Sequence, residues 1–220
     1  MDGYLIPAIE HRVETRVSNS TFIATIAPAF SIDQARNFIA QISDEFRDAT
    51  HNVPVYIIGH GTSKTTHSND DGEPSGTAGR PALAVLEGSG LGDTALVITR
   101  YFGGTKLGTG GLVKAYSDAA RQVIDSVPKA EKVQVHKLRL QIPYSFFEII
   151  SRIIKSSGGT ILTQDFKAQV TLIATVPVNA YPAFEKRVTE ATSGNFFPEI
   201  LARNQSAKIA LNNSTFEERD

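Results

Sequence analysis

The chain has 220 residues and no obvious internal repeat, which indicates one large domain or two small ones. Its 22 basic and 23 acidic residues give a net charge of −1, so a basic footprint for nucleic acid over the whole surface is excluded and only a local patch remains. The absence of cysteine excludes disulfides, thiolate catalysis and iron–sulfur clusters. Without a secretory signal or an apolar run approaching the roughly 18–20 residues of a membrane span, we expect a cytoplasmic protein with no membrane contact.

The first quarter of the chain predicts strands followed by a helix. Residues 1–28 contain three β-rich stretches. Ser31 and Gln34 then have the spacing of a capping box, and apolar residues recur after them at helical spacing up to residue 46. Val53–Ile58 is a short strand candidate, in which Pro54 favours an edge position or the start of a strand.

A long polar stretch follows, from Gly59 to Pro81, and it has no apolar period. Loops longer than about 12–15 residues inside a compact domain are uncommon and are often functional or disordered. We then predict a short helix over Ala82–Leu86, a strong strand over Thr94–Phe102, a glycine-rich segment, and an amphipathic helix with its apolar face over residues 112–124.

The second half of the chain has its own complete pattern. Its elements follow the order β-α-β-β-α-β, which is that of a ferredoxin-like α+β sandwich. The sequence therefore predicts an α+β protein of two domains, residues 1–130 and residues 131–203. Residues 204–220 lack a period, and we expect them to form a disordered tail.

The strongest local signal lies between Arg100 and Lys114, where a strand runs through a glycine-rich turn into a helix. The first helical turn leaves N–H groups unpaired, glycines let an anion come close, and the helix dipole favours negative charge. The alternative is that the glycines only permit tight turns and close packing. A Walker loop and a dinucleotide fingerprint do not fit, because Thr109 follows Gly108 and Val113 stands where Gly or Ala is needed. The predicted anion-binding residues are Arg80, Arg100, Gly103, Gly104, Lys106, Gly108, Thr109, Gly110, Gly111 and Lys114.

Asp70, Asp71 and Glu73 place three carboxylates within four positions. They can hold Mg²⁺ together with phosphate oxygens, or act as an acid–base pair. The alternative, which we favour, is an Asx-turn at Asp70–Gly72 on a solvated loop. The histidines nearby do not have the spacing of zinc ligands, and we expect His51 to lie at the start of a strand. We therefore expect no metal and no other cofactor.

These motifs resemble the YigZ/IMPACT family. The matching stretches are Ser20–Ile23, His51, the block that begins at Asp70, and Arg100–Tyr116. The resemblance implies a first domain similar to ribosomal proteins and to domain IV of elongation factor G, with a left-handed βαβ crossover, followed by a ferredoxin-like domain. It also implies a role linked to translation or nucleic acid, which is inferred from these two folds. Eukaryotic IMPACT proteins regulate translation under amino-acid starvation, partly through an extra N-terminal domain whose partner does not carry over to this chain.

Three functions stay open on the sequence. The leading hypothesis is a non-enzymatic protein that binds RNA or the ribosome through its first domain and acts in translation. The second is an enzyme acting on a phosphorylated or nucleotide substrate, with Asp70, Asp71 or Glu73 holding Mg²⁺ or moving protons. The third is an adaptor whose loops bind a translation-related protein partner.

Overall fold

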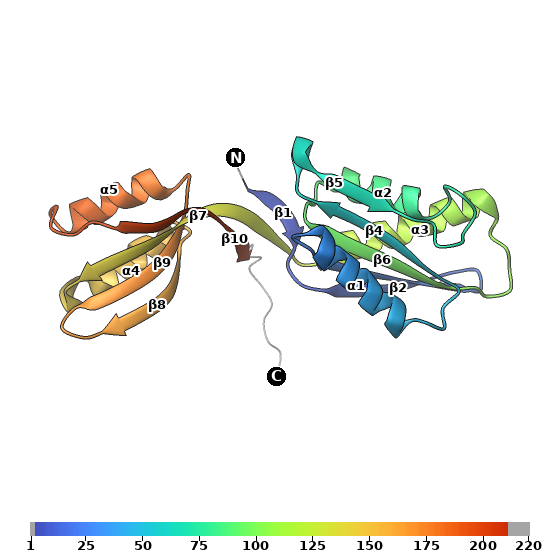
Figure 1. Ribbon diagram of the computed structural model, residues 1–220, viewed down its shortest axis with the longest axis horizontal. Coiled ribbons are helices and arrows are strands. Elements are labelled where there is room, and N and C mark those ends of the chain that lie inside the picture. Colours follow the sequence, from blue (N-terminus) through green and yellow to red (C-terminus); the bar gives the residue numbers. More distant parts are fainter. Residues whose placement is uncertain (1–2, 211–220) are drawn as a thin grey trace. The chain divides into compact units, whose positions relative to one another are not determined.

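The computed structural model describes residues 3–210, and within them the chain forms two compact units (Figure 1). The first unit covers residues 4–131 and the second covers residues 132–209, so the boundary falls next to the one predicted after residue 130. Each unit combines helices with a sheet, in agreement with the predicted α+β class. No helix within residues 3–210 is both long enough and apolar enough to cross a membrane.

The first unit begins with strands and ends with its longest helix. Its elements are β1 (Tyr4–Pro7), β2 (His11–Val17), β3 (Ser20–Pro28), α1 (Ile32–Glu45), β4 (His51–Ile58), η1 (Gly61–Ser63), β5 (Thr65–Ser68), α2 (Gly79–Gly88), β6 (Thr94–Tyr101) and α3 (Gly108–Ser126).

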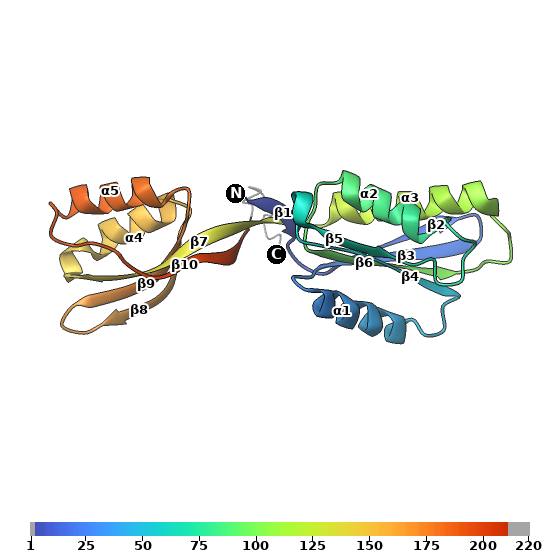
Figure 2. The same ribbon diagram turned by 45° about the horizontal axis from the view of Figure 1, so that its top comes forward.

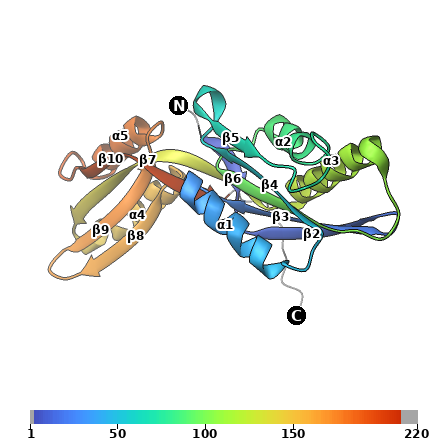
Figure 3. The ribbon, with the colours of Figure 1, turned by 45° about the vertical axis from the view of Figure 1, so that its right-hand side comes forward.

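Apart from β1, these elements form three layers, and the middle layer is a five-stranded sheet of order β2-β3-β6-β4-β5 in which all neighbours are antiparallel (Figure 3). Strands β3 and β4 therefore run parallel to each other on either side of β6, and α1 connects them. Helix α1 packs on one face of the sheet, while α2 and α3 pack on the other (Figure 2). The main core lies between the sheet and the helices α2 and α3.

Strand β6 lies at the centre of this sheet, and every residue of it except Tyr101 is buried. Helices cover both of its faces, which explains why its sequence shows no polar alternation. The prediction that Pro54 favours an edge strand or the start of a strand is wrong, because β4 lies between β6 and β5 and begins at His51. The Pro54 carbonyl accepts a hydrogen bond from the Asn69 N–H at 3.2 Å, away from β6. The missing N–H of Pro54 therefore removes no bond from the β4–β6 ladder.

The polar stretch from Gly59 to Pro81 contains more regular structure than its sequence predicts. Both η1 and β5 lie within it, and neither contains a buried residue, so no apolar period marks them. Helix α2 begins at Gly79, before the predicted start at Ala82. At the start of α1, by contrast, the predicted cap is present: the Ser31 hydroxyl accepts from the Gln34 N–H at 3.1 Å.

The second unit has the predicted order β-α-β-β-α-β. Its elements are β7 (Lys129–Ile142), η2 (Tyr144–Phe146), α4 (Phe147–Ser156), β8 (Thr160–Phe166), β9 (Val170–Pro177), α5 (Tyr181–Ala191) and β10 (Glu199–Ala210).

Alternate residues are buried along β9 and over residues 136–142 of β7, and the apolar ones form one core with α4 and α5. Both helices lie on the same face of this sheet (Figure 2). The prediction of a disordered tail from Asn204 onward needs correction, because β10 continues to Ala210 and pairs with β7. The rest of that predicted tail lies outside the described residues. The sequence predicted the start of this strand but not its continuation, because polar residues from Arg203 to Ser206 interrupt the apolar pattern.

Candidate functional site

One buried polar network joins all four stretches that carry the family resemblance. It contains Ser20 at the start of β3, His51 at the start of β4, Glu73 in the polar loop, Arg100 near the end of β6, and Tyr116 in α3. The Arg100 guanidinium donates to Glu73 Oε1 at 2.6 Å and to Ser20 Oγ at 3.2 Å. The Tyr116 hydroxyl donates to the same Glu73 oxygen at 2.8 Å. The polar stretch from Gly59 to Pro81 is therefore bound, through Glu73, to the strand and the helix on either side of the glycine-rich segment.

The charged members of this network are almost fully withdrawn from water. The side chains of Glu73 and Arg100 are 3% and 6% exposed, and Tyr116 is completely buried. Burial, together with the negative charge of Glu73, raises the pKa of Tyr116 far above its ordinary value, so this hydroxyl is a permanent donor. Two charges in such a place stabilise the fold only as a hydrogen-bonded pair. The network can hold parts of the chain together, but it offers no open site for chemistry.

His51 lies at the rim of the network and is the first residue of β4, as predicted. Its Nδ1 lies 2.6 Å from the Asp71 carbonyl, which only accepts hydrogen bonds, so Nδ1 is the protonated nitrogen. Its Nε2 lies 3.8 Å from the second oxygen of Glu73. His51 therefore connects the loop backbone to the buried carboxylate.

The three loop carboxylates face different partners. Asp70 accepts hydrogen bonds from the N–H groups of residues 76, 78 and 79, so it caps the start of α2 from nine residues upstream. Asp71 accepts from the Asn52 N–H at 2.6 Å, and Glu73 belongs to the network. Within residues 3–210, no group of three His, Asp or Glu side chains is placed to hold a metal ion. The Asx-turn predicted at Asp70–Gly72 on a solvated loop is wrong, because the Asp70 side chain accepts from residues 76, 78 and 79 and Glu73 is buried. A backbone turn stands there instead, closed by a hydrogen bond from the Glu73 N–H to the Asp70 carbonyl.

The glycines between β6 and α3 have separate roles. Gly103 is needed for packing, since a Cβ there would lie 1.8 Å from the Asn19 carbonyl oxygen. Gly104 and Gly108 have positive φ angles, which L-residues with a side chain rarely adopt. Gly110 has neither reason: its φ is not positive, and no described atom lies within 4 Å of a Cβ built on it. A glycine in a helix costs roughly 1 kcal/mol relative to alanine, so the fold alone does not account for Gly110.

The predicted cations separate into exposed and buried residues. Arg80, Lys106 and Lys114 are exposed, although the Lys114 ammonium also lies 3.1 Å from Asp118. Arg100 is buried against Glu73, so the expectation that it contacts phosphate is corrected. Thr109 and Gly111 lie in the first turn of α3, next to Gly110. Sequence reasoning missed the roles of Ser20 and Tyr116, which no spacing rule connects to Glu73.

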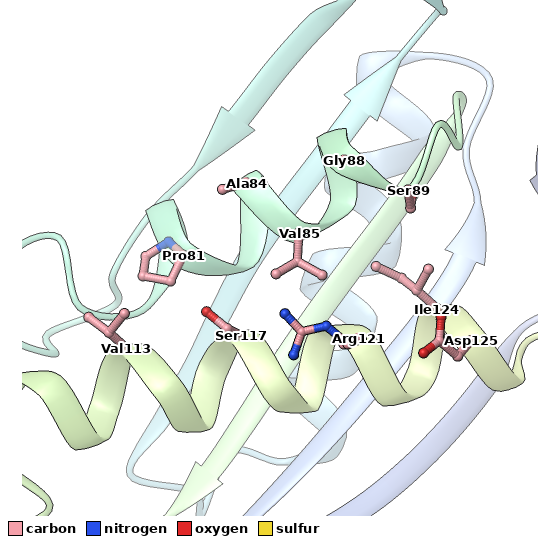
Figure 4. A pocket seen from close by; sticks show the side chains of 10 residues that line it. All are labelled: Pro81, Ala84, Val85, Gly88, Ser89, Val113, Ser117, Arg121, Ile124 and Asp125. Atoms are coloured by element: carbon pink, nitrogen blue, oxygen red, sulfur yellow. The ribbon is translucent and has the colours of Figure 1, made fainter.

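A groove on the described surface lies elsewhere, between the facing side chains of α2 and α3 (Figure 4). This groove of about 650 Å³ is open to solvent and contains no residue of the buried network. It is lined by Pro81, Ala84, Val85, Gly88, Ser89, Val113, Ser117, Arg121, Ile124 and Asp125.

Comparisons with known proteins agree with this two-part architecture. The family model of the Impact N-terminal domain matches residues 18–124, which contain the whole buried network. A second model, described as a domain of unknown function, DUF1949, matches residues 140–195. The class is therefore that of proteins in which an Impact N-terminal domain precedes a DUF1949 domain.

The full-length relatives identify the family. The chain is 34% identical to an "IMPACT family member" of Haemophilus influenzae over 91% of this chain and 98% of that one. It is 33% identical to "IMPACT family member YigZ" of Escherichia coli over 92% and 98% of the two chains. A solved structure described as a hypothetical protein has 31% identity and a TM-score of 0.61, and covers 97% of this chain. This chain belongs to the IMPACT family.

Breaking the buried ion pair on one side leaves the other charge unpaired. We expect Glu73→Leu and Arg100→Met each to lower the free energy of unfolding by about 3–5 kcal/mol. The double variant should lose clearly less free energy of unfolding than the sum of the two single losses, because it leaves no buried charge. Urea unfolding followed by circular dichroism measures all four proteins. If the loss of free energy of unfolding in the double variant equals the sum of the two single losses, the two charges do not depend on each other.

The cap of α2 should make stability depend on pH at the acidic end. Burial acts to raise the pKa of Asp70, but the three N–H donors and the charge of Arg80 together lower it below its ordinary value. The folded pKa is thus below the unfolded one, so the charge stabilises the fold above about pH 4, and this is lost as the pH falls through the folded value.

We therefore expect Asp70→Asn to lower the free energy of unfolding by about 1 kcal/mol at pH 7, and this difference from wild type to shrink as the pH falls below about 4. Urea unfolding at several pH values measures the difference. Asp44→Asn, an exposed change on α1, is the control. If the free energy of unfolding of Asp70→Asn stays below that of wild type by the same amount from pH 7 to pH 3, the charge of Asp70 does not have this role.

Proposed function

We propose that this IMPACT-family protein binds RNA or a ribosomal site through its first unit and acts in translation or its regulation. The observation that carries the proposal is the first turn of α3, Gly108–Gly111. The side chain of the N-cap residue Leu107 makes no capping hydrogen bond to this turn. The turn also contains no acidic residue. Unpaired N–H groups and the helix dipole at such a terminus favour a phosphate group.

Positive charge lies close to this turn along the chain. Lys106 is exposed two residues before α3 begins, and Lys114 is exposed within the helix. Arg80 is exposed in the first turn of α2, which packs against α3. These three side chains can supply the charge that phosphate binding needs on a chain whose net charge is −1. Family membership adds support, because the resemblance to IMPACT proteins implies a role linked to translation.

The first test is binding of the purified protein to single-stranded RNA and to ribosomal subunits at two salt concentrations. We expect the affinity to fall as salt rises, because each phosphate contact releases counterions. Lys106→Ala should weaken RNA binding several-fold and reduce the salt slope by about 0.7 on single-stranded RNA. Arg36→Ala removes an exposed charge from α1, on the opposite face of the sheet, and should change neither quantity.

Salt-independent binding, or equal losses in Lys106→Ala and Arg36→Ala, would contradict the proposal. Mg²⁺-dependent nucleotide binding that is lost in Asp71→Asn would favour the enzyme hypothesis instead. A protein partner that remains bound after nuclease treatment would favour the adaptor hypothesis.

Gly110 gives a second and sharper test. Alanine meets no neighbouring atom at this position and is the better helix former, so Gly110→Ala should keep or raise the free energy of unfolding, by up to about 1 kcal/mol. The added methyl group should nevertheless weaken RNA binding, because it keeps a phosphate away from the helix amides. Unfolding and binding are measured on the same preparation. Unchanged binding would show that Gly110 is not approached by the ligand.

A further inference from the structure

Phe102 follows directly after β6 and keeps 45% of its surface exposed. Its position is fixed from two sides. Its N–H donates to the Thr50 hydroxyl at 3.0 Å, and the next residue, Gly103, packs tightly against Asn19. A large aromatic ring is thus held at the surface on a well-fixed backbone.

Arg100 lies over one face of the exposed Phe102 ring. The Arg100 guanidinium carbon lies 5.5 Å from the centroid of this ring and 5.4 Å from the centroid of Phe22, which is fully buried. The cation therefore lies close to both an inner and an outer ring. Nearly half of the outer ring remains accessible to a ligand.

The sequence next to Phe102 carries the chemistry of phosphate binding. Lys106 follows four residues later, at most about 14 Å of chain away, and the open turn of α3 begins two residues after that. Single-stranded nucleic acid is bound by this pairing of aromatic faces for the bases with basic groups for the backbone. A duplex presents its bases already stacked on one another and offers no face to a single ring.

We infer that Phe102 stacks an unpaired base of single-stranded RNA whose backbone contacts Lys106 and the start of α3. This inference rests on the proposed function and specifies the ligand as single-stranded. The Phe102 ring would hold the base in position, and the positive charge of Lys106 would attract the phosphate.

A purely structural role would have a different signature. If Phe102 only shields Arg100 from water, leucine can replace it, because leucine is also apolar and covers much of the same area. A base needs a flat π-face, so leucine cannot replace phenylalanine in stacking. The pair Phe102→Leu and Phe102→Trp therefore separates shielding from stacking.

The experiment measures binding of the full chain to a fluorescent single-stranded RNA, to the same strand without bases, and to a duplex of equal length. Base stacking is worth about 1–3 kcal/mol, so Phe102→Ala and Phe102→Leu should weaken binding to the RNA about 5- to 150-fold, while Phe102→Trp keeps it. Binding to the baseless strand and to the duplex should not change in these variants. Phe197→Ala, which removes a phenylalanine that is 62% exposed in the second unit, is the matched control and should behave as wild type.

Circular dichroism unfolding confirms that each variant is folded, and Lys106→Ala separates failure of the inference from failure of the proposed function. Lys106→Ala should weaken binding to both the RNA and the baseless strand. If Lys106→Ala weakens RNA binding and Phe102→Leu does not, the stacking inference is wrong and the proposed function stands. The same holds if Phe102→Ala weakens binding to the baseless strand as much as to the RNA. If the wild-type chain binds no single-stranded RNA, the stacking inference is wrong, and if it binds no ribosomal subunit either, the proposed function is wrong as well.

Discussion

The buried ion pair between Glu73 and Arg100 is the constraint on which the first unit depends. Arg100 belongs to the central strand, and Glu73 belongs to a loop 27 residues earlier in the chain. Neither charge is stable without the other at this depth, because transfer of a single ion from water into the core costs several kcal/mol. The position of the loop is therefore tied to the central strand by electrostatics, with Ser20 and Tyr116 providing further hydrogen bonds to the two charges.

This arrangement explains how a stretch with few apolar residues is ordered. From Gly59 to Pro81 there is little side-chain surface to bury, so hydrophobic packing cannot fix the chain there. Polar contacts replace it: Asp70 caps α2, Asp71 binds the backbone of β4, and Glu73 enters the core. The carboxylates that resemble a metal site in the sequence are thus the groups that hold the loop in place.

The regular elements could be predicted from the sequence wherever burial decides them. The strand before Phe102 and the helix after Leu112 have apolar patterns that follow directly from the layers they lie in. The site could be predicted only in part. The sequence around an arginine at the end of a strand does not indicate whether its side chain faces water or a carboxylate. Only the contact with Glu73, which is distant in the sequence, shows that Arg100 is buried. Likewise, Gly103 and Gly110 are the same residue type, but Asn19 makes one of them a packing requirement.

The same network determines which residues remain for recognition. It takes Glu73, Arg100 and Tyr116 out of contact with solvent, so they cannot bind a ligand directly. It also fixes the end of β6, from which the loop to α3 departs, and so limits the freedom of that loop. Phe102 and Lys106 are exposed on this loop, and the Phe102 N–H is held by the Thr50 hydroxyl. In the proposed binding of RNA, the buried charges would therefore act only by fixing the end of the strand from which these exposed residues project.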